Sequence, residues 1–394
     1  MSAATLKRLA ILRDPAGGPR AWRFVRTEGP DPALALAGRT VEAAARLVPL
    51  VFNLCGAAHG LAARRALGLP TPADGAAMAR ESVRDHALAI LHGWPTLLGG
   101  TPDRAALGAL ARPGPEADLA LAAALAGAGM AGRDFCALSP AALDGWLRAG
   151  ETATARILCR LRRESDPADG RAGLPELTAA DLVGTLAEDG DASAAHREAA
   201  AGHGARGIPD GATKGATAPA LLLRDAAPLC PDAGDGLPGS TQPRAEPSPP
   251  EPRTPPLRET GALGRVAGTP LFHALLAEEG PSIFVRLLAR LADLLALLSG
   301  PGPAAPSSPA GTGLAEAARG LLGHGARVEG GRVARYRILS PSAWNLAPGG
   351  LLERAFATLD AASPPTPLLA GFLLSAVNPC VPVTLDLEGA LRHA

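Results

Sequence analysis

Two short segments near opposite ends of the chain carry the side chains best suited to hold a transition metal. Cys55 and His59 lie four residues apart in a stretch with helical periodicity, so both would lie on one face of a helix. Cys380 follows Asn378 and Pro379 in an apolar tail. Thiolate and imidazole are ligands for soft and borderline metals. A buried cysteine and a histidine in an Ala-rich helix are more often ordinary core residues, so these residues alone do not establish a metal site.

Three segments between these ends carry longer patterns. They read ETGALGR at 259–265, AARGLLGH at 317–324 and SPSAWNLAP at 340–348. They resemble, in the same order, the E-x-G-P-L-A-R, A-P-R-G-x-L-x-H and V-P-S-T-W-N-L-x-P motifs of the large subunit of nickel-iron hydrogenases. The two end segments are similar to the C-x-x-C-x-x-x-H and D-P-C-x-x-C-x-x-H motifs of that family. The resemblance covers roughly residues 30–100 and 257–390.

The resemblance implies roles for particular residues. The positions that match the family's site are Cys55, His59 and Cys380 for metal, and Arg319, Pro341 and Ser342 for the cyanide ligands of the iron. In the family, the arginine and serine matched by Arg319 and Ser342 donate hydrogen bonds to those cyanides. Such donors are needed because a cyanide nitrogen buried without a partner would bear the cost of an unsatisfied polar group. A guanidinium also adds positive charge beside an anionic fragment.

The chain departs from the family pattern at the metal ligands. Phe52 stands at the position of the first cysteine, Val383 at that of the last, and Asp386 at that of the final histidine. Nickel held by soft thiolates would be under-coordinated, whereas an iron that already carries two cyanides and one carbon monoxide needs few protein ligands. These departures resemble the HupK-type branch of the family, the large-subunit-like hydrogenase expression and formation proteins.

That branch implies a non-catalytic scaffold or carrier in hydrogenase maturation. The expected cargo is a transient Fe(CN)2CO fragment, with no nickel, and the expected partners are hydrogenase maturation chaperones and the hydrogenase large subunit. One alternative is a hydrogenase-type oxidoreductase subunit with a reduced metal site. Another is a metal-free structural relative, like the large-subunit-type proteins of respiratory quinone oxidoreductases, which lose all the cysteines. Retention of Cys55, His59 and Cys380 argues against the last alternative.

Composition excludes several other classes of function. The chain has 394 residues, of which 47% are hydrophobic, and its 38 Lys plus Arg balance 38 Asp plus Glu. No bulk field would therefore draw it to nucleic acid or to an anionic membrane. No stretch approaches the roughly 20 apolar residues of a membrane span, and no secretion signal precedes the helical patterns. The five cysteines are an odd, scattered set that does not indicate a disulfide framework. We expect a cytoplasmic protein with reduced thiols.

The pattern along the chain predicts a mainly α fold with a small β-hairpin element, an α+β class that is hydrogenase large-subunit-like. Helical periodicity marks residues 40–48, 54–67, 77–91, 115–126, 141–163, 282–298 and 368–377. Gly330 and Gly331 between β-prone runs predict a hairpin. Residues 21–163 are expected to be mostly helical, and residues 1–163 and 257–394 are expected to pack as one interleaved domain. The Gly/Pro-rich insertion at 164–256 is expected to be largely disordered, with a marginal helix at 179–187.

Other candidate residues carry less weight. His86 and His92 are six residues apart, which is not a same-face helical spacing, so a structural role is the simpler interpretation. Cys136 and Cys159 have no neighbouring ligand in the sequence and are expected to be structural thiols. The site residues, by contrast, should converge in space although more than three hundred residues separate Cys55 from Cys380.

Overall fold

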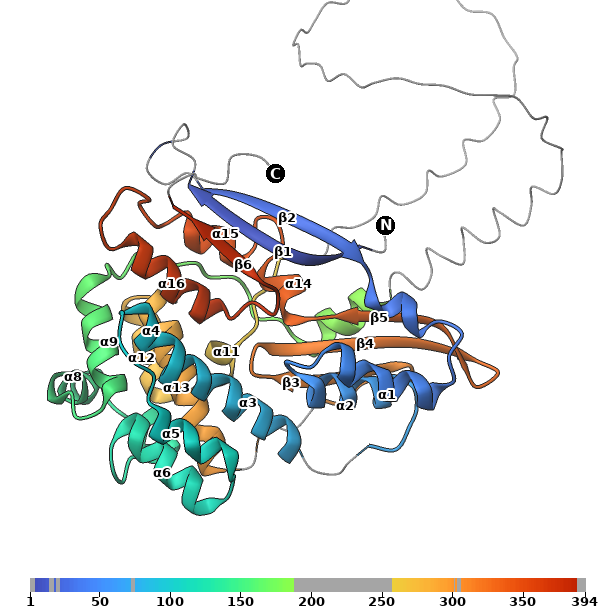
Figure 1. The fold of residues 1–394 in the computed structure, drawn as a ribbon, viewed down its shortest axis with the longest axis horizontal. Helices are drawn as coiled ribbons and strands as arrows, with labels where there is room; N and C mark the ends of the chain where they lie inside the picture. The colour runs from blue at the N-terminus through green and yellow to red at the C-terminus, as the bar shows by residue number, and fades with distance from the viewer. Residues whose placement is uncertain are drawn as a thin grey trace, which may run out of the picture. The chain divides into compact units, whose positions relative to one another are not determined.

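The fold is described from a computed structural model over residues 4–13, 18, 22–71, 75–187, 257–300, 302 and 306–387. Described residues from both ends of the chain, on either side of the insertion, belong to one compact unit (Figure 1). Within the described ranges, no helix combines the length and the apolar character needed to cross a membrane.

Helices form most of the first half of the chain and much of the second. Those before the insertion are η1 (Pro32–Leu36), α1 (Val41–Val51), α2 (Gly56–Ala66), α3 (Ala76–Leu88), η2 (Ala89–Gly93), α4 (Trp94–Leu97), α5 (Arg104–Gly108), η3 (Ala109–Ala111), α6 (Pro115–Ala126), α7 (Gly132–Cys136), α8 (Pro140–Ala149) and α9 (Ala153–Glu164). Those after it are α11 (Ala262–Val266), α12 (Pro270–Glu278), α13 (Ile283–Ser299), α14 (Pro341–Asn345), α15 (Leu351–Phe356) and α16 (Thr366–Val377).

Helix α13 is the centre of the helical core. Ser282 caps its first turn by accepting a hydrogen bond from the amide of Val285. The helix is buried on all sides from Ile283 to Leu295, and α3, α7, α11 and α16 surround it. A helix that is apolar all round must be enclosed in this way. Its few buried charged residues therefore need partners on the surrounding elements.

The strands form two three-stranded sheets within the described ranges. One sheet has the order β2 (Trp22–Pro30), β1 (Ala4–Arg13), β6 (Val383–Asp386), and the other β3 (Thr312–Ala317), β4 (Gly320–Glu329), β5 (Arg332–Leu339). In the first sheet β1 pairs antiparallel with β2 and parallel with β6. In the second, α2 lies against β3 and β4 (Figure 1). The sheets thus join N-terminal to C-terminal segments.

The predicted α+β class is confirmed, but the β content exceeds a single hairpin. The hairpin itself is present, because β4 and β5 pair around Gly330 and Gly331, whose φ angles of 55° and 73° suit the tight turn. The expectation of a mostly helical segment from residue 21 onward was wrong over Trp22–Pro30. That strand is stabilised by pairing with β1, which the search for helical periodicity did not detect.

The insertion is folded at its beginning, where disorder was expected. Over residues 164–187, Leu177 and Leu182 are buried against Leu321 and Trp344, and the helix predicted at 179–187 is present. Leu177 also hydrogen-bonds to the carbonyl of Glu259 across the two ends of the insertion. Packing against the β3–β5 sheet supplies the stabilisation that composition alone did not reveal. Residues 188–256, where the rest of that prediction falls, lie outside the described ranges.

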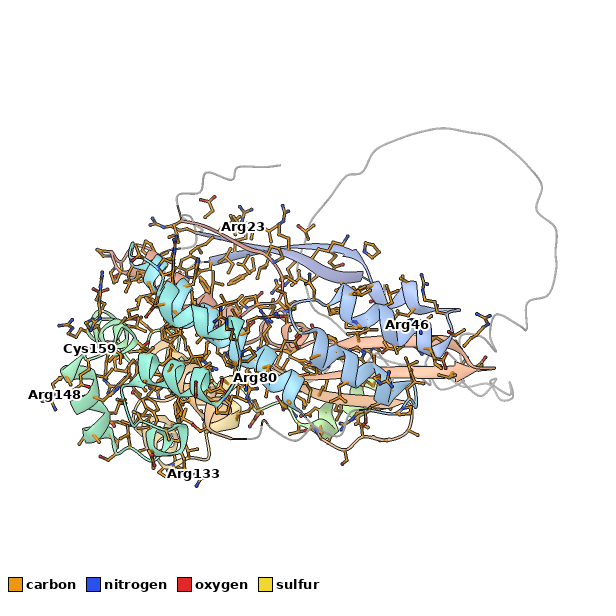
Figure 2. The ribbon with its side chains drawn as sticks, turned by 60° about the horizontal axis from the view of Figure 1, so that its bottom comes forward. Arg23, Arg46, Arg80, Arg133, Arg148 and Cys159 are labelled. Carbon is orange, nitrogen blue, oxygen red and sulfur yellow. The ribbon has the colours of Figure 1, made fainter. Side chains whose placement is uncertain are left out.

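The helical pattern at 141–163 contains two helices instead of one. Gly150 ends α8 with a left-handed φ of 58°, and Thr152 then caps α9 by accepting a hydrogen bond from the amide of Ala155. Glycine is the usual residue at such a helix end. Figure 2 shows Arg148 of α8 and Cys159 of α9 together, far from Arg46 of α1.

Candidate functional site

Cys55 lies at the junction between α1 and α2. It is the residue that precedes α2, and its carbonyl accepts the first helical hydrogen bond from the amide of His59 at 3.0 Å. The free amides of Ala57 and Ala58 at the start of α2 donate to the carboxylate of Glu81 instead of to a capping side chain. Cys55 is buried, and burial raises the pKa of its thiol to about 12, although the nearby Arg319 opposes the shift.

Arg319 lies in the tight turn that joins β3 to β4. The next residue, Gly320, has φ +118°, and a Cβ there would lie 2.2 Å from Oγ1 of Thr260. The Thr260 hydroxyl accepts a hydrogen bond from the amide of Leu321 at 2.9 Å. The backbone of Thr260 is in turn held by both side-chain groups of Asn345, at 3.0 and 2.8 Å. The three central sequence motifs therefore meet at this turn and hold it in place.

The guanidinium of Arg319 is buried and only partly satisfied. Its Nη2 forms an ion pair with Oδ2 of Asp85 at 2.7 Å. Its Nε and Nη1 are buried and make no hydrogen bond to any residue that the structure describes. Because buried polar groups in proteins are nearly always paired, two such donors on one side chain indicate a missing acceptor.

Cys380 reaches the same region from the C-terminal side. Helix α16 ends at Asn378, which adopts a left-handed φ of 54° and donates from Nδ2 to Oδ1 of Asp85 at 2.8 Å. The amide of Cys380 donates to Oγ of Ser342 at 2.9 Å, so the serine hydroxyl hydrogen remains available to another acceptor. The thiol of Cys380 lies close enough to Cys55 to affect its pKa. Asp85 and Ser342 thus position the C-terminal cysteine.

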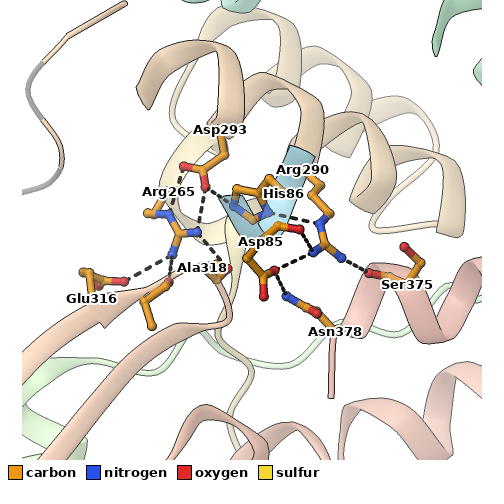
Figure 3. Close-up of polar contacts among 10 residues, drawn as sticks. Asp85, His86, Arg265, Arg290, Asp293, Glu316, Ala318, Ser375 and Asn378 are labelled. Carbon is orange, nitrogen blue, oxygen red and sulfur yellow. Dashed lines mark hydrogen bonds and ion pairs between the residues drawn. The ribbon is translucent and has the colours of Figure 1, made fainter. Parts of the chain in front are cut away.

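A network of buried charges supports this region from the side of α13 (Figure 3). Arg290 donates to Asp85 Oδ1 at 2.6 Å and to Nδ1 of His86 at 3.0 Å, and Nε2 of His86 lies 2.8 Å from Asp293. Asp293 also forms a two-point ion pair with Arg265, at 2.9 and 2.7 Å. Burial alone would raise the pKa of Asp85, but the nearby Arg290 and other cations outweigh it and lower the pKa. The carboxylates therefore stay ionised.

His59 has partners other than a metal. Its ring stacks on Phe52 with the centroids 4.2 Å apart, and its Nδ1 lies 2.8 Å from Nε2 of His324. Nδ1 of His324 lies 2.7 Å from the hydroxyl of Tyr336. Burial lowers the pKa of His59 to about 3 and that of His324 well below its ordinary value. Both imidazoles are therefore neutral.

The structure brings some of the expected site residues together, whereas His59 has partners of its own. Arg319 and Cys380 each lie within electrostatic range of Cys55, and Ser342 contacts the backbone of Cys380. Pro341 is buried at the first turn of α14, beside Ser342. Within the described ranges no three His, Cys, Asp or Glu side chains are placed to hold a metal ion, so the expected three-ligand site with His59 is not assembled.

The two positions where the family's cysteines are missing are used differently. Phe52 covers one face of His59, and Val383 begins β6, where it pairs with Leu9 of β1. Of the remaining cysteines within the described ranges, Cys136 is buried and Cys159 is half-buried on α9.

Several residues of the site were missed by the sequence interpretation. Asp85, Glu81 and Tyr336 each contact a residue or element of the site but stand in none of the motifs, and His324, the last residue of the 317–324 motif, was given no role. A usable signal was present for His86, a polar residue beside Asp85 on a helix whose apolar face includes Val83 and Ala87. His86 has the structural role expected for it, as a partner of Asp293.

Comparison with known proteins shows which family this chain resembles. A family model described as nickel-dependent hydrogenase matches residues 254–382. The chain is 29% identical to the hydrogenase expression/formation protein HoxV of Cupriavidus necator, over 90% of each chain. A solved structure of the reduced, active nickel-iron-selenium hydrogenase from Desulfomicrobium baculatum is 13% identical, with 96% of each chain covered and a TM-score of 0.48. The hydrogenase expression/formation protein HupK of Rhodobacter capsulatus is 32% identical, over 93% of this chain and 92% of that relative. This chain therefore belongs to the HupK family of hydrogenase expression/formation proteins.

Proposed function

We propose that this chain is a non-catalytic accessory protein of hydrogenase maturation that holds an iron–dicyanide–carbonyl fragment in transit to the hydrogenase large subunit. Its relatives are named for hydrogenase expression and formation. In this proposal the fragment is cargo, held only until it is passed on. The partners are the maturation chaperones that deliver it and the large subunit that receives it, and the exchange takes place in the cytoplasm.

The observation that carries the proposal is the pair of unpartnered donors on Arg319. A buried N–H without an acceptor costs about 1–3 kcal/mol, more when the group is charged. Asp85 fixes one side of the guanidinium and leaves Nε and Nη1 unused. A cyanide nitrogen is an anionic, linear acceptor that would satisfy such a donor. The hydroxyl hydrogen of Ser342 provides a second donor for a cyanide.

Cys55 and Cys380 would be the protein ligands of the iron. Both are free thiols, and thiolates suit a soft low-spin iron. Burial raises the pKa of the Cys55 thiol to about 12, so the thiol is protonated at neutral pH without metal. It would lose this proton as the metal binds, because the ligand is the thiolate. The positive charge of Arg319 nearby favours the thiolate. His59 is left out of the ligand set, since its Nδ1 is already engaged by His324.

Absence of two cysteines supports a carrier over an enzyme. Phe52 stacks on His59 and Val383 is part of a sheet, so neither position can supply a thiolate to nickel. A hydrogenase-type subunit with a reduced metal site would need other ligands for that nickel. A metal-free relative would have no need of Cys55, Cys380 and the open donors of Arg319 together.

Infrared spectroscopy of the protein, purified after co-expression with the hydrogenase maturation proteins, tests the proposal directly. We expect bands of iron-bound cyanide and carbonyl in the wild type, their loss in Cys55→Ser and Cys380→Ser, and their retention in Cys159→Ser. Cys159 is the matched control because it is a thiol of the same chain on α9, which lies away from α2 (Figure 1). Wild-type protein without these bands, or full hydrogenase maturation in cells with the folded double Cys55→Ser, Cys380→Ser variant, would contradict the proposal.

A further inference from the structure

The segment before Cys55 presents large aliphatic side chains to solvent. Leu50, Val51 and Leu54 have exposed fractions of 74%, 46% and 51%. A single exposed leucine is ordinary on a protein surface. Three such side chains within five residues, next to a cysteine of the site, form an apolar patch of the kind that marks an interaction surface.

The backbone beneath this apolar patch is held in place. The patch spans the last turn of α1 and the connection to α2. The amide of Phe52 donates to the carbonyl of Val48 at 3.1 Å, and the amide of Cys55 donates to the carbonyl of Phe52 at 3.1 Å. Gly56 packs so closely on α1 that a Cβ there would lie 3.0 Å from the carbonyl oxygen of Pro49. The aliphatic side chains are therefore exposed by the fold itself.

A pocket of about 290 Å³ opens between α3 and α6. The aliphatic side chains of Val83, Leu110 and Leu121 line it, together with charged residues that include Arg84 and Glu81. Residues that dominate binding energy at protein interfaces usually fill such pockets with one large side chain. The pocket thus suits a single apolar anchor of a protein partner.

Glu81 connects the pocket to the apolar patch. Its carboxylate lines the pocket and also accepts hydrogen bonds from the amides of Ala57 at 3.0 Å and Ala58 at 3.4 Å, at the start of α2. Those amides come three and four residues after Leu54. The apolar patch and the pocket therefore border the same helix start, and one partner can cover both.

The charges around the pocket leave one cation available. The carboxylate of Glu81 is engaged by the amides of α2, and that of Asp118 forms a two-point ion pair with Arg80. Arg84 is exposed and forms no hydrogen bond or ion pair with any described residue, although its charge lies within range of Glu81. A carboxylate on a partner would complement this guanidinium.

The size of this surface indicates a transient contact. A standard stable interface buries roughly 800 Å² on each partner, spread over about 20–30 residues. Three aliphatic side chains, one pocket and one arginine fall well short of that area. A permanent dimer of this chain would need a larger surface, whereas a partner that leaves after each encounter would not.

We propose that Leu50, Val51, Leu54 and the α3–α6 pocket with Arg84 at its edge form a docking face for the maturation chaperone that brings the iron fragment to Cys55. The chaperone would place an apolar side chain in the pocket and a carboxylate beside Arg84. The name of this partner rests on the proposed function. The docking face itself rests on exposure, packing and charge.

Biolayer interferometry with the full-length protein and the purified iron-fragment chaperone tests the apolar patch. We expect the double variant Leu50→Ser, Leu54→Ser to bind about tenfold or more weakly, because two leucines lose their burial. Leu119→Ser is the matched control, since Leu119 is 72% exposed on α6 and does not line the pocket. Equal urea midpoints for all three proteins would show that the fold is kept. Wild-type affinity in the double variant would overturn the proposal.

Two further variants test the pocket and the charge. Ala117→Phe fills the pocket from α6 and should weaken binding. Arg84→Gln should lower the association rate and its dependence on salt, because a charge at the edge of an interface acts mainly on association. Arg148→Gln is the control, an exposed arginine on α8 that lies far from Arg46 of α1 (Figure 2). Binding unchanged in both Ala117→Phe and Arg84→Gln would refute the role of the pocket.

Infrared spectra separate this inference from the proposed function. If the chaperone binds at the docking face and the wild type shows no cyanide or carbonyl bands, the carrier proposal fails and the docking face stands. If the bands are present, the double variant should lose them, and full bands in that variant would overturn delivery at this face. A wild type that does not bind the chaperone would also overturn the proposal. Sedimentation that shows a wild-type dimer split by the double variant would assign the face to a second copy instead.

Discussion

Asp85→Asn is the most informative single substitution in the charged network. The carboxylate of Asp85 binds Nη2 of Arg319 at 2.7 Å, Nη2 of Arg290 at 2.6 Å and Nδ2 of Asn378 at 2.8 Å. The side chain of Asp85 is only 12% exposed. One carboxylate therefore pairs with two buried guanidiniums and also holds the segment that precedes Cys380.

The expected loss of stability follows from this geometry. Removing the charge of one partner in a buried ion pair costs about 3–5 kcal/mol, because the other charge stays buried and uncompensated. Asparagine keeps the shape and one acceptor, and Arg290 retains its bonds to Ser375 and His86, so we expect the lower end of that range. Since a typical domain has a free energy of unfolding of about 5–15 kcal/mol, the change is large but compatible with folding.

Urea unfolding followed by circular dichroism at pH 7 measures this loss, with Asp118→Asn as the matched control. Asp118 makes a two-point ion pair with Arg80 at 2.6 and 2.8 Å, but the Arg80 side chain is 44% exposed. An exposed pair contributes about 0–1 kcal/mol, so the same substitution there should have little effect. If Asp85→Asn lowers the free energy of unfolding by no more than Asp118→Asn does, the inference that Asp85 organises the site is refuted.

Three further outcomes are expected. Arg319→Lys should leave the protein folded but reduce its iron-bound cyanide and carbonyl bands, because lysine keeps the charge and loses the planar fork that can serve several acceptors; undiminished bands would contradict this. The pKa of His59, about 3, lies below the value of about 6.5 in an unfolded chain, so the unfolded state takes up the proton first and stability falls as pH drops. The contribution of His59 to the free energy of unfolding should fall by about 1.4 kcal/mol for each pH unit below 6.5. Urea unfolding at pH 6.5 and 4.5 should therefore show a smaller loss of stability in His59→Gln than in the wild type. Gly320→Ala should lower the free energy of unfolding by about 1–3 kcal/mol, because the backbone there has φ +118° and the new Cβ would lie 2.2 Å from Thr260. Gly108→Ala is the control, since a Cβ at Gly108 meets open space, and it should not destabilise the protein. Equal unfolding midpoints for the two variants would refute the strain at Gly320.

Local elements were predictable because their determinants are local. The pattern at 115–126 coincides with α6, and α13 begins directly after its cap Ser282. Gly330 and Gly331 fix the β4–β5 hairpin through their positive φ angles. Periodicity, caps and turn glycines act within a few residues, so they can be read without knowing what packs against them.

The sheet at the termini was not predictable in this way. Strand β1 pairs with β6 through contacts such as Leu9 with Val383, almost the whole length of the chain apart. Nothing near either strand indicates its partner. The folded start of the insertion is similar, since Leu182 is stable only because it packs on Leu314 and Trp344 from another part of the chain.

Motif spacing alone identifies Cys55, Arg319, Ser342 and Cys380 as site residues and gives their order along the chain. Their surroundings come from folding. It placed Asp85 against Arg319 and gave His59 the partner His324, so that a candidate ligand is engaged elsewhere. The reason is physical: a side chain's identity limits its chemistry, whereas its protonation state and its free donors depend on burial and on partners that only folding brings near.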